Sequence, residues 1–229
     1  MLTPSANQRC KRAARLSPFV LAGHYPPGCP GPESSEAHRQ IVHIEGTLEP
    51  NQGPPEVHGR RIWSSRVPNK VKVFSWLYFK DRLSTRANLC AKSILDTDQC
   101  QRCSAGTQDW HHVFFVCPTS AGVWARLNMS HVAALSDVDI WNADTPPNLD
   151  AKMWPFVLQS ILWRLWDARN GTIFRNEHPS SRSVSSKISD DLVIWRKRFK
   201  NDSDVHSLNS WRAYLLYCNS SNSSTVVDP

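Results

Sequence analysis

The chain has 229 residues, which suits one compact domain with tails or one and a half small domains. Hydrophobic residues make up 40% of it and ten residues are Trp, so a core can form over much of its length. No run of about 18 apolar residues occurs, which excludes a membrane-spanning helix. The net formal charge of +7 favours acidic partners such as nucleic acid.

The basic charge is concentrated in one segment. Residues 1–58 are rich in Pro, Ser, Gly and Glu and lack apolar periodicity, so we expect a disordered N-terminal leader there. Residues 60–92 then carry nine basic side chains against a single acidic one, Asp81. The basic segment therefore immediately precedes the cysteine cluster described below.

The remaining sequence predicts a mostly α-helical protein. A helix is expected after Pro68, with Val71, Phe74, Leu77 and Tyr78 on its buried face. A short helix follows, with Ser84 or Thr85 as its N-cap, and TSAGVWARL predicts another after the cysteines.

Helical periodicity is clearest in the C-terminal half. Apolar residues repeat every three or four positions over 151–169, where Gly171 is expected to end the helix, and again over 183–200 and 205–217. The predicted organisation is a disordered leader over 1–58, a small helical domain with one zinc knuckle over 60–128, a linker over 129–150, a helical C-terminal region over 151–217 and a disordered tail over 218–229.

The chemically specific feature is CQRCSAGTQDWHHVFFVC. Cys100 and Cys103 are separated by two residues, so a tight turn can direct both sulfurs toward one ion. His112 and Cys117 supply two more donors of the kinds that zinc prefers. Because four protein ligands complete a tetrahedron, we expect a structural zinc site, Cys100, Cys103, His112 and Cys117, in a reducing compartment.

His111 competes with His112 for the fourth position. Five residues of an α-helix turn the chain by about 500°, which places His112 and Cys117 about 140° apart. The helix must therefore unwind before Cys117, and Pro118 disfavours helical geometry at that residue. The angular offset between His111 and Cys117 is no better, and the two residues are further apart in sequence, so we favour His112.

The segment from Ile62 to Trp124 resembles the reverse transcriptase zinc-binding domain found downstream of the polymerase in plant non-LTR (LINE-type) retrotransposons. The block WRLWDARNGTIF also resembles the region that follows this domain. A Glu common in the family before the His is replaced here by Gln108 and Asp109. The residues that match the family pattern are Trp63, Pro68, Lys70, Val71, Phe74, Trp76, Arg82, Leu83, Thr85, Cys100, Cys103, His112, Cys117, Pro118, Val123 and Trp124.

Catalysis is not expected from this sequence. A polymerase needs carboxylates around two metal ions, and no Tyr-x-Asp-Asp motif occurs. Asp190 and Asp191 form the sole Asp pair and are expected on a helix surface. The resemblance implies a non-catalytic zinc-binding module that contacts RNA or DNA, without a small-molecule substrate or a membrane.

Two functions stay open. In the first, basic residues beside the knuckle bind nucleic-acid phosphates, and about six such contacts would lower affinity by roughly 10³-fold between 50 and 200 mM salt. The candidates are Arg60, Arg61, Arg66, Lys70, Lys72, Lys80, Arg82, Arg86 and Lys92, with a second basic cluster at Arg196, Lys197, Arg198 and Lys200. In the second, the chain is a zinc-stapled helical scaffold or protein-interaction module. Location in the nucleus or cytoplasm, without secretion, is expected in either case.

Overall fold

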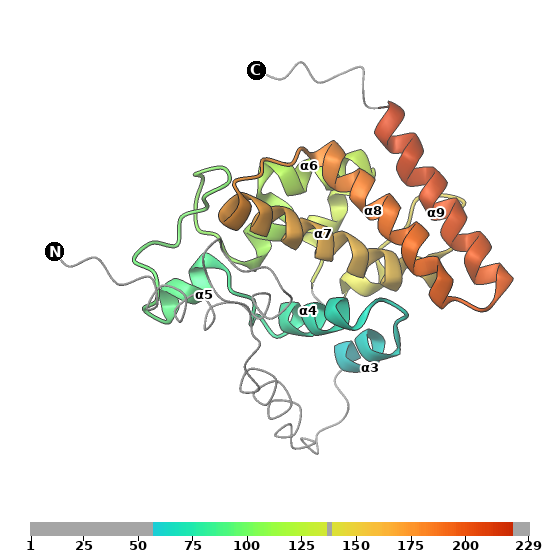
Figure 1. Ribbon diagram of the computed structural model, residues 1–229, viewed down its shortest axis with the longest axis horizontal. Coiled ribbons are helices and arrows are strands. Elements are labelled where there is room, and N and C mark those ends of the chain that lie inside the picture. The colour runs from blue at the N-terminus through green and yellow to red at the C-terminus, as the bar shows by residue number, and fades with distance from the viewer. Residues whose placement is uncertain (1–56, 137–138, 222–229) are drawn as a thin grey trace, which may run out of the picture. The chain divides into compact units, whose positions relative to one another are not determined.

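The structure is a computed structural model that describes residues 57–136 and 139–221 (Figure 1). The expected leader over 1–58 lies outside the described residues except for its last two positions, and residues 222–229 of the expected tail lie outside them too. Within the described ranges there are helices, one isolated antiparallel bridge between Gln99 and Thr107, and no β-strand. The mostly α-helical class is confirmed. No described helix is long and apolar enough to cross a membrane.

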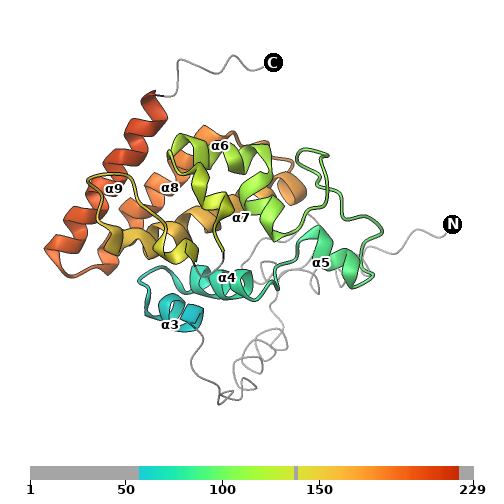
Figure 2. The ribbon, with the colours of Figure 1, turned by 180° about the vertical axis from the view of Figure 1, so that it is seen from behind.

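The helix α7 (Trp154–Arg175) lies between α4 on one side and α6 and α8 on the other, as both views show (Figures 1 and 2). The other α-helices are α3 (Val57–Ser64), α4 (Asn69–Phe79), α5 (Arg86–Ala91), α6 (Pro118–Arg126), α8 (Ser181–Trp195) and α9 (Asp202–Ser221). Short helical segments are η2 (His112–Val116), η3 (Ser130–Ala134), η4 (Asp139–Asn142), η5 (Ala151–Met153) and η6 (Arg196–Arg198).

The helix α3 was not expected from the sequence, whereas α4 and α5 form where the sequence predicts helices. In α4, Val71, Phe74 and Tyr78 are buried as predicted, whereas Leu77 is only partly buried. The Phe74 ring meets Trp163 and Trp166 of α7 at 5.5 and 6.4 Å between centroids, which fixes α4 against α7. Of the two N-cap candidates for α5, Thr85 takes the position and its hydroxyl accepts from the Asn88 amide at 3.2 Å.

The helix α7 is buried on nearly all sides because α4, α8, η2 and η4 surround it. It does not end at Gly171, as expected from the sequence, but continues to Arg175. Asn176 then adopts a left-handed conformation with φ of 53°, and its amide bonds the Gly171 carbonyl. Asn tolerates this conformation, so it terminates the helix in place of the expected glycine.

The helices α8 and α9 complete the bundle and pack against each other. The periodicity over 183–200 predicts an apolar stripe of Val184, Ile188, Leu192, Trp195 and Phe199, and all of these except Phe199 are buried. The α-helix ends at Trp195, earlier than expected, and Phe199 follows η6 in extended conformation. The helix α9 is longer than the predicted 205–217 and includes the first four residues of the expected tail.

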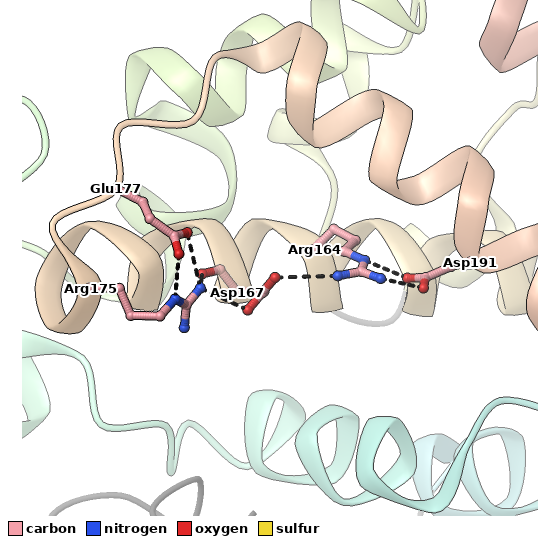
Figure 3. A network of polar contacts seen from close by, with 5 residues as sticks. All are labelled: Arg164, Asp167, Arg175, Glu177 and Asp191. Carbon is pink, nitrogen blue, oxygen red and sulfur yellow. Dashed lines mark hydrogen bonds and ion pairs between the residues drawn. The ribbon is translucent and has the colours of Figure 1, made fainter. Parts of the chain in front are cut away.

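Buried charges join α7 to α8 (Figure 3). Arg164 of α7 donates from Nε to Asp191 Oδ2 at 2.6 Å and from Nη2 to Asp191 Oδ1. Asp191 is only 2% exposed, whereas Asp190 is exposed. The expectation that both carboxylates lie on a helix surface is therefore wrong for Asp191, because the packing of α8 on α7 covers it.

The described residues of the predicted linker over 129–150 contribute several side chains to the core. Met129, Ile140 and Trp141 are each at most 2% exposed. The Trp154 indole at the start of α7 donates to the Ile140 carbonyl at 2.7 Å. The helices before and after this segment thus share one apolar core, since α4 and η2 contact α7 directly and α6 contacts α8.

Candidate metal centre

Four side chains that suit a metal ion converge where the sequence places them. The ligand atoms of Cys100, Cys103, His112 and Cys117 all lie within 4.8 Å of one another. Cys103 Sγ lies 3.3 Å from His112 Nε2. Ligands at normal zinc bond lengths in a tetrahedron are separated by about 3.5–3.8 Å, so this arrangement needs little adjustment to hold an ion.

The first two cysteines lie on a tight loop. The Ser104 amide bonds the Cys100 carbonyl at 2.9 Å, and the Cys100 amide bonds the Gly106 carbonyl at 3.0 Å. Ser104 and Gly106 have positive φ values of 56° and 69°, which turn the chain back on itself. Both sulfurs consequently point to the same side, as the Cys-x2-Cys spacing predicts.

The histidine and the last cysteine lie at the two ends of the π-helical segment η2. The Cys117 amide bonds the His112 carbonyl at 2.8 Å, an i to i+5 bond that closes a wider turn than an α-helix has. In this wider turn, residues five apart come close to the same face. Cys117 itself is extended, with φ of −54° and ψ of 131°, directly before Pro118. The predicted unwinding is confirmed, and its form is a π turn.

His111 faces away from the cluster. Its Nε2 lies 3.1 Å from the Ala133 carbonyl, and its ring packs on Phe115. His112 is instead 8% exposed, and its amide bonds the Asp109 carboxylate at 2.7 Å, which anchors the start of η2. Of the two candidate histidines, His112 is the one in the cluster.

The electrostatics of the site suit an anionic metal centre. A hydrogen bond from Cys117 lowers the pKa of Cys100 to about 3, and the same bond together with burial raises the pKa of Cys117. The charge of Arg102 opposes that rise. Both terminal nitrogens of Arg102 are buried without a hydrogen-bond partner in the described part of the chain. Three sulfur donors beside a positive charge whose terminal nitrogens lack partners in the described residues fit a divalent ion, which would hold all three sulfurs as thiolates. Nothing in the sequence singles out Arg102.

The nine predicted phosphate-binding residues lie in several different environments. Arg60, Arg82 and Lys92 are exposed, and Arg61 bonds Asn142 at 3.2 Å. Arg86 donates to the Thr97 carbonyl at 2.8 Å. The rest lie along α4 or next to one of its ends, namely Arg66, Lys70, Lys72 and Lys80.

Two of these residues meet the second basic cluster. Arg66 and Lys72 line an open pocket of about 370 Å³ together with Arg198 and Lys200, and Ser65 and Val67 complete the lining. The Arg66 guanidinium lies 4.9 Å above the Phe199 ring. In the described part of the chain, none of the four cations is paired with a carboxylate.

Comparisons with known proteins agree with this site. Residues 48–124 match the family described as zinc-binding in reverse transcriptase. This match confirms the resemblance to the reverse transcriptase zinc-binding domain that was found in the sequence.

A protein of Arabidopsis thaliana named as a ribonuclease H protein is 27% identical over 123 residues, covering 49% of this chain. The match spans only 19% of that relative's length. No solved structure matches the chain.

Proposed function

We propose that the chain is a non-catalytic zinc-binding module that holds the phosphates of single-stranded nucleic acid at the pocket between the start of α4 and the segment after α8. The observation that carries this proposal is the convergence of Arg66 and Lys72 with Arg198 and Lys200, which are more than 120 residues apart in sequence. Cations gathered without carboxylates attract phosphates, whereas cations on an ordinary helix surface are scattered.

Zinc supports this surface by shaping the domain. Cys100, Cys103, His112 and Cys117 would hold the ion, which supplies folding energy and no open coordination position for a substrate or water. The proposed module therefore binds nucleic acid and catalyses no reaction. Because metal-binding thiols must stay reduced, we place it in the nucleus or cytoplasm.

RNA is the partner that the family match favours, since the family description refers to reverse transcriptase. The Arabidopsis relative is named for ribonuclease H, an activity that also concerns nucleic acid. Neither name specifies a nucleotide sequence that this chain would recognise. The cations of the pocket suit the phosphates of the nucleic-acid backbone.

The test is fluorescence anisotropy with a labelled single-stranded RNA and a DNA of equal length, titrated at several salt concentrations. Four phosphate contacts predict that affinity falls about 50-fold between 50 and 200 mM salt. Arg198→Gln/Lys200→Gln should reduce the salt slope by about 1.4. Arg182→Gln/Arg212→Gln, which removes two exposed charges outside the pocket, is the matched control and should reduce it less.

Metal analysis of the same samples completes the experiment. Stoichiometric zinc with salt-sensitive binding supports the proposal. Stoichiometric zinc with no binding, or with equal effects of the two double variants, rejects the phosphate pocket and favours the scaffold alternative. A protein without zinc rejects the metal centre.

A further inference from the structure

One fully buried cation of α7 has no acidic partner. Arg169 is 2% exposed, yet within the described part of the chain none of its hydrogen bonds goes to a carboxylate. Its acceptors are Gln108 Oε1, at 3.0 Å from Nε and 2.8 Å from Nη2, the Ser84 carbonyl at 3.0 Å and Asn170 Oδ1 at 3.0 Å. A buried charge that lacks a counter-charge is strongly unfavourable, so compensation must come from elsewhere.

Gln108 connects this cation to the metal centre. The side chain is fully buried, and its Nε2 donates to Cys100 Sγ at 3.5 Å while its Oε1 accepts from Arg169. The orientation of the amide follows from chemistry, because a guanidinium has only donors and must face the oxygen. The amide N–H is thereby aimed at the sulfur, where a thiolate is a good acceptor.

The metal centre supplies the negative counter-charge that Arg169 lacks. Three thiolates and a neutral imidazole around a divalent ion carry a net charge of −1. Arg102, whose terminal nitrogens lack hydrogen-bond partners in the described residues, also lies close enough for its charge to act on Cys117. The Arg169 guanidinium also lies 4.7 Å from the centroid of the Trp166 ring, a favourable cation–π contact.

We propose that Arg169 and Gln108 are positioning residues of the metal centre, so that the buried guanidinium of α7 balances the thiolate charge through the Gln108 amide. Arg169 lies well beyond the family match, which ends at residue 124. The zinc domain and the helical region after it are consequently one metal-linked unit, and α7 docks more tightly when the ion is bound. This inference rests on the metal binding proposed above.

The test uses the full chain and competition for Zn²⁺ against a chelating indicator. Arg169→Met and Gln108→Leu should each raise the dissociation constant for Zn²⁺ by about 10- to 100-fold, the usual effect of losing a group that supports a metal ligand. The double variant should be little worse than the poorer single variant, because both changes break the same link. Arg175→Met is the matched control, since it removes a guanidinium from the same helix at a partly exposed position, and it should leave the constant within twofold.

Cobalt substitution separates positioning from general destabilisation. In the Co²⁺-loaded protein, Gln108→Leu should shift the sulfur-to-cobalt charge-transfer band, because Cys100 Sγ loses the hydrogen bond from Gln108. Arg175→Met should leave the band unchanged. Unchanged bands and zinc affinity in folded Gln108→Leu would overturn the inference even if Arg169→Met failed to fold. A wild-type chain that binds no metal would instead reject the proposed function.

Discussion

Replacing Arg164 by Met removes the cation of the ion pair that joins α7 to α8 (Figure 3). The Asp191 side chain is 3% exposed and receives hydrogen bonds from Nε and Nη2 of Arg164. Without them the carboxylate stays buried and unpaired, which costs about 3–5 kcal/mol at neutral pH. In a chain of this size the expected fall in melting temperature is roughly 10 °C.

Two companion variants show whether the burial of Asp191 causes this loss. Arg164→Met/Asp191→Leu removes both charges and should recover most of the stability, because an apolar pair fits the same interface. Arg175→Met removes Arg175 from its ion pairs with Glu177 and Asp167, and should cost less than about 1 kcal/mol because these side chains are partly exposed.

The loss in Arg164→Met should also depend on pH. Burial raises the pKa of the Asp191 carboxyl even in wild type, and Arg164 opposes that rise, so removing Arg164 raises the folded-state pKa further. A raised folded-state pKa favours the folded state at lower pH, and it penalises the fold as pH rises through that pKa. The deficit against wild type should therefore shrink between pH 7 and pH 5.

The measurement is urea and thermal unfolding of the metal-loaded chain, followed by circular dichroism at both pH values. A deficit no larger than that of Arg175→Met would refute the reasoning. So would a double variant as unstable as Arg164→Met alone.

Two further predictions concern the metal loop and the end of α7. Cys103→Ser should lose tight zinc binding and raise hydrogen exchange over 95–120 while α8 stays protected; mass spectrometry measures both, and unchanged metal content or exchange would contradict it. Asn176→Val should lower stability by about 1–2 kcal/mol, because a β-branched residue is strained at φ of 53°, whereas Asn176→Gly should be neutral or stabilising. Equal melting temperatures for the Val and Gly variants would rule out the strain argument.

The ligand set and most helices are determined locally, and the sequence alone predicts them. Cys-x2-Cys needs only a tight turn to bring two sulfurs together, and the stripe in α8 needs only helical periodicity. Even the unwinding before Cys117 follows from the angle between residues five apart and from Pro118. The sequence predicts helix ends less well. Asn176, and not Gly171, ends α7, where the Glu177 amide bonds back to the Gly171 carbonyl.

Only the tertiary structure decides what surrounds the site. Gln108 and Arg169 are 61 residues apart, and no spacing rule relates a glutamine in a loop to an arginine on a later helix. The pocket likewise needs Phe199 to bring Arg198 and Lys200 beside Arg66. Asp191 is hidden by α7, although its position in the sequence resembles that of a surface residue. These contacts arise because packing buries whichever polar groups lie at the helix interfaces, and burial then makes each of them depend on a partner that the local sequence does not contain.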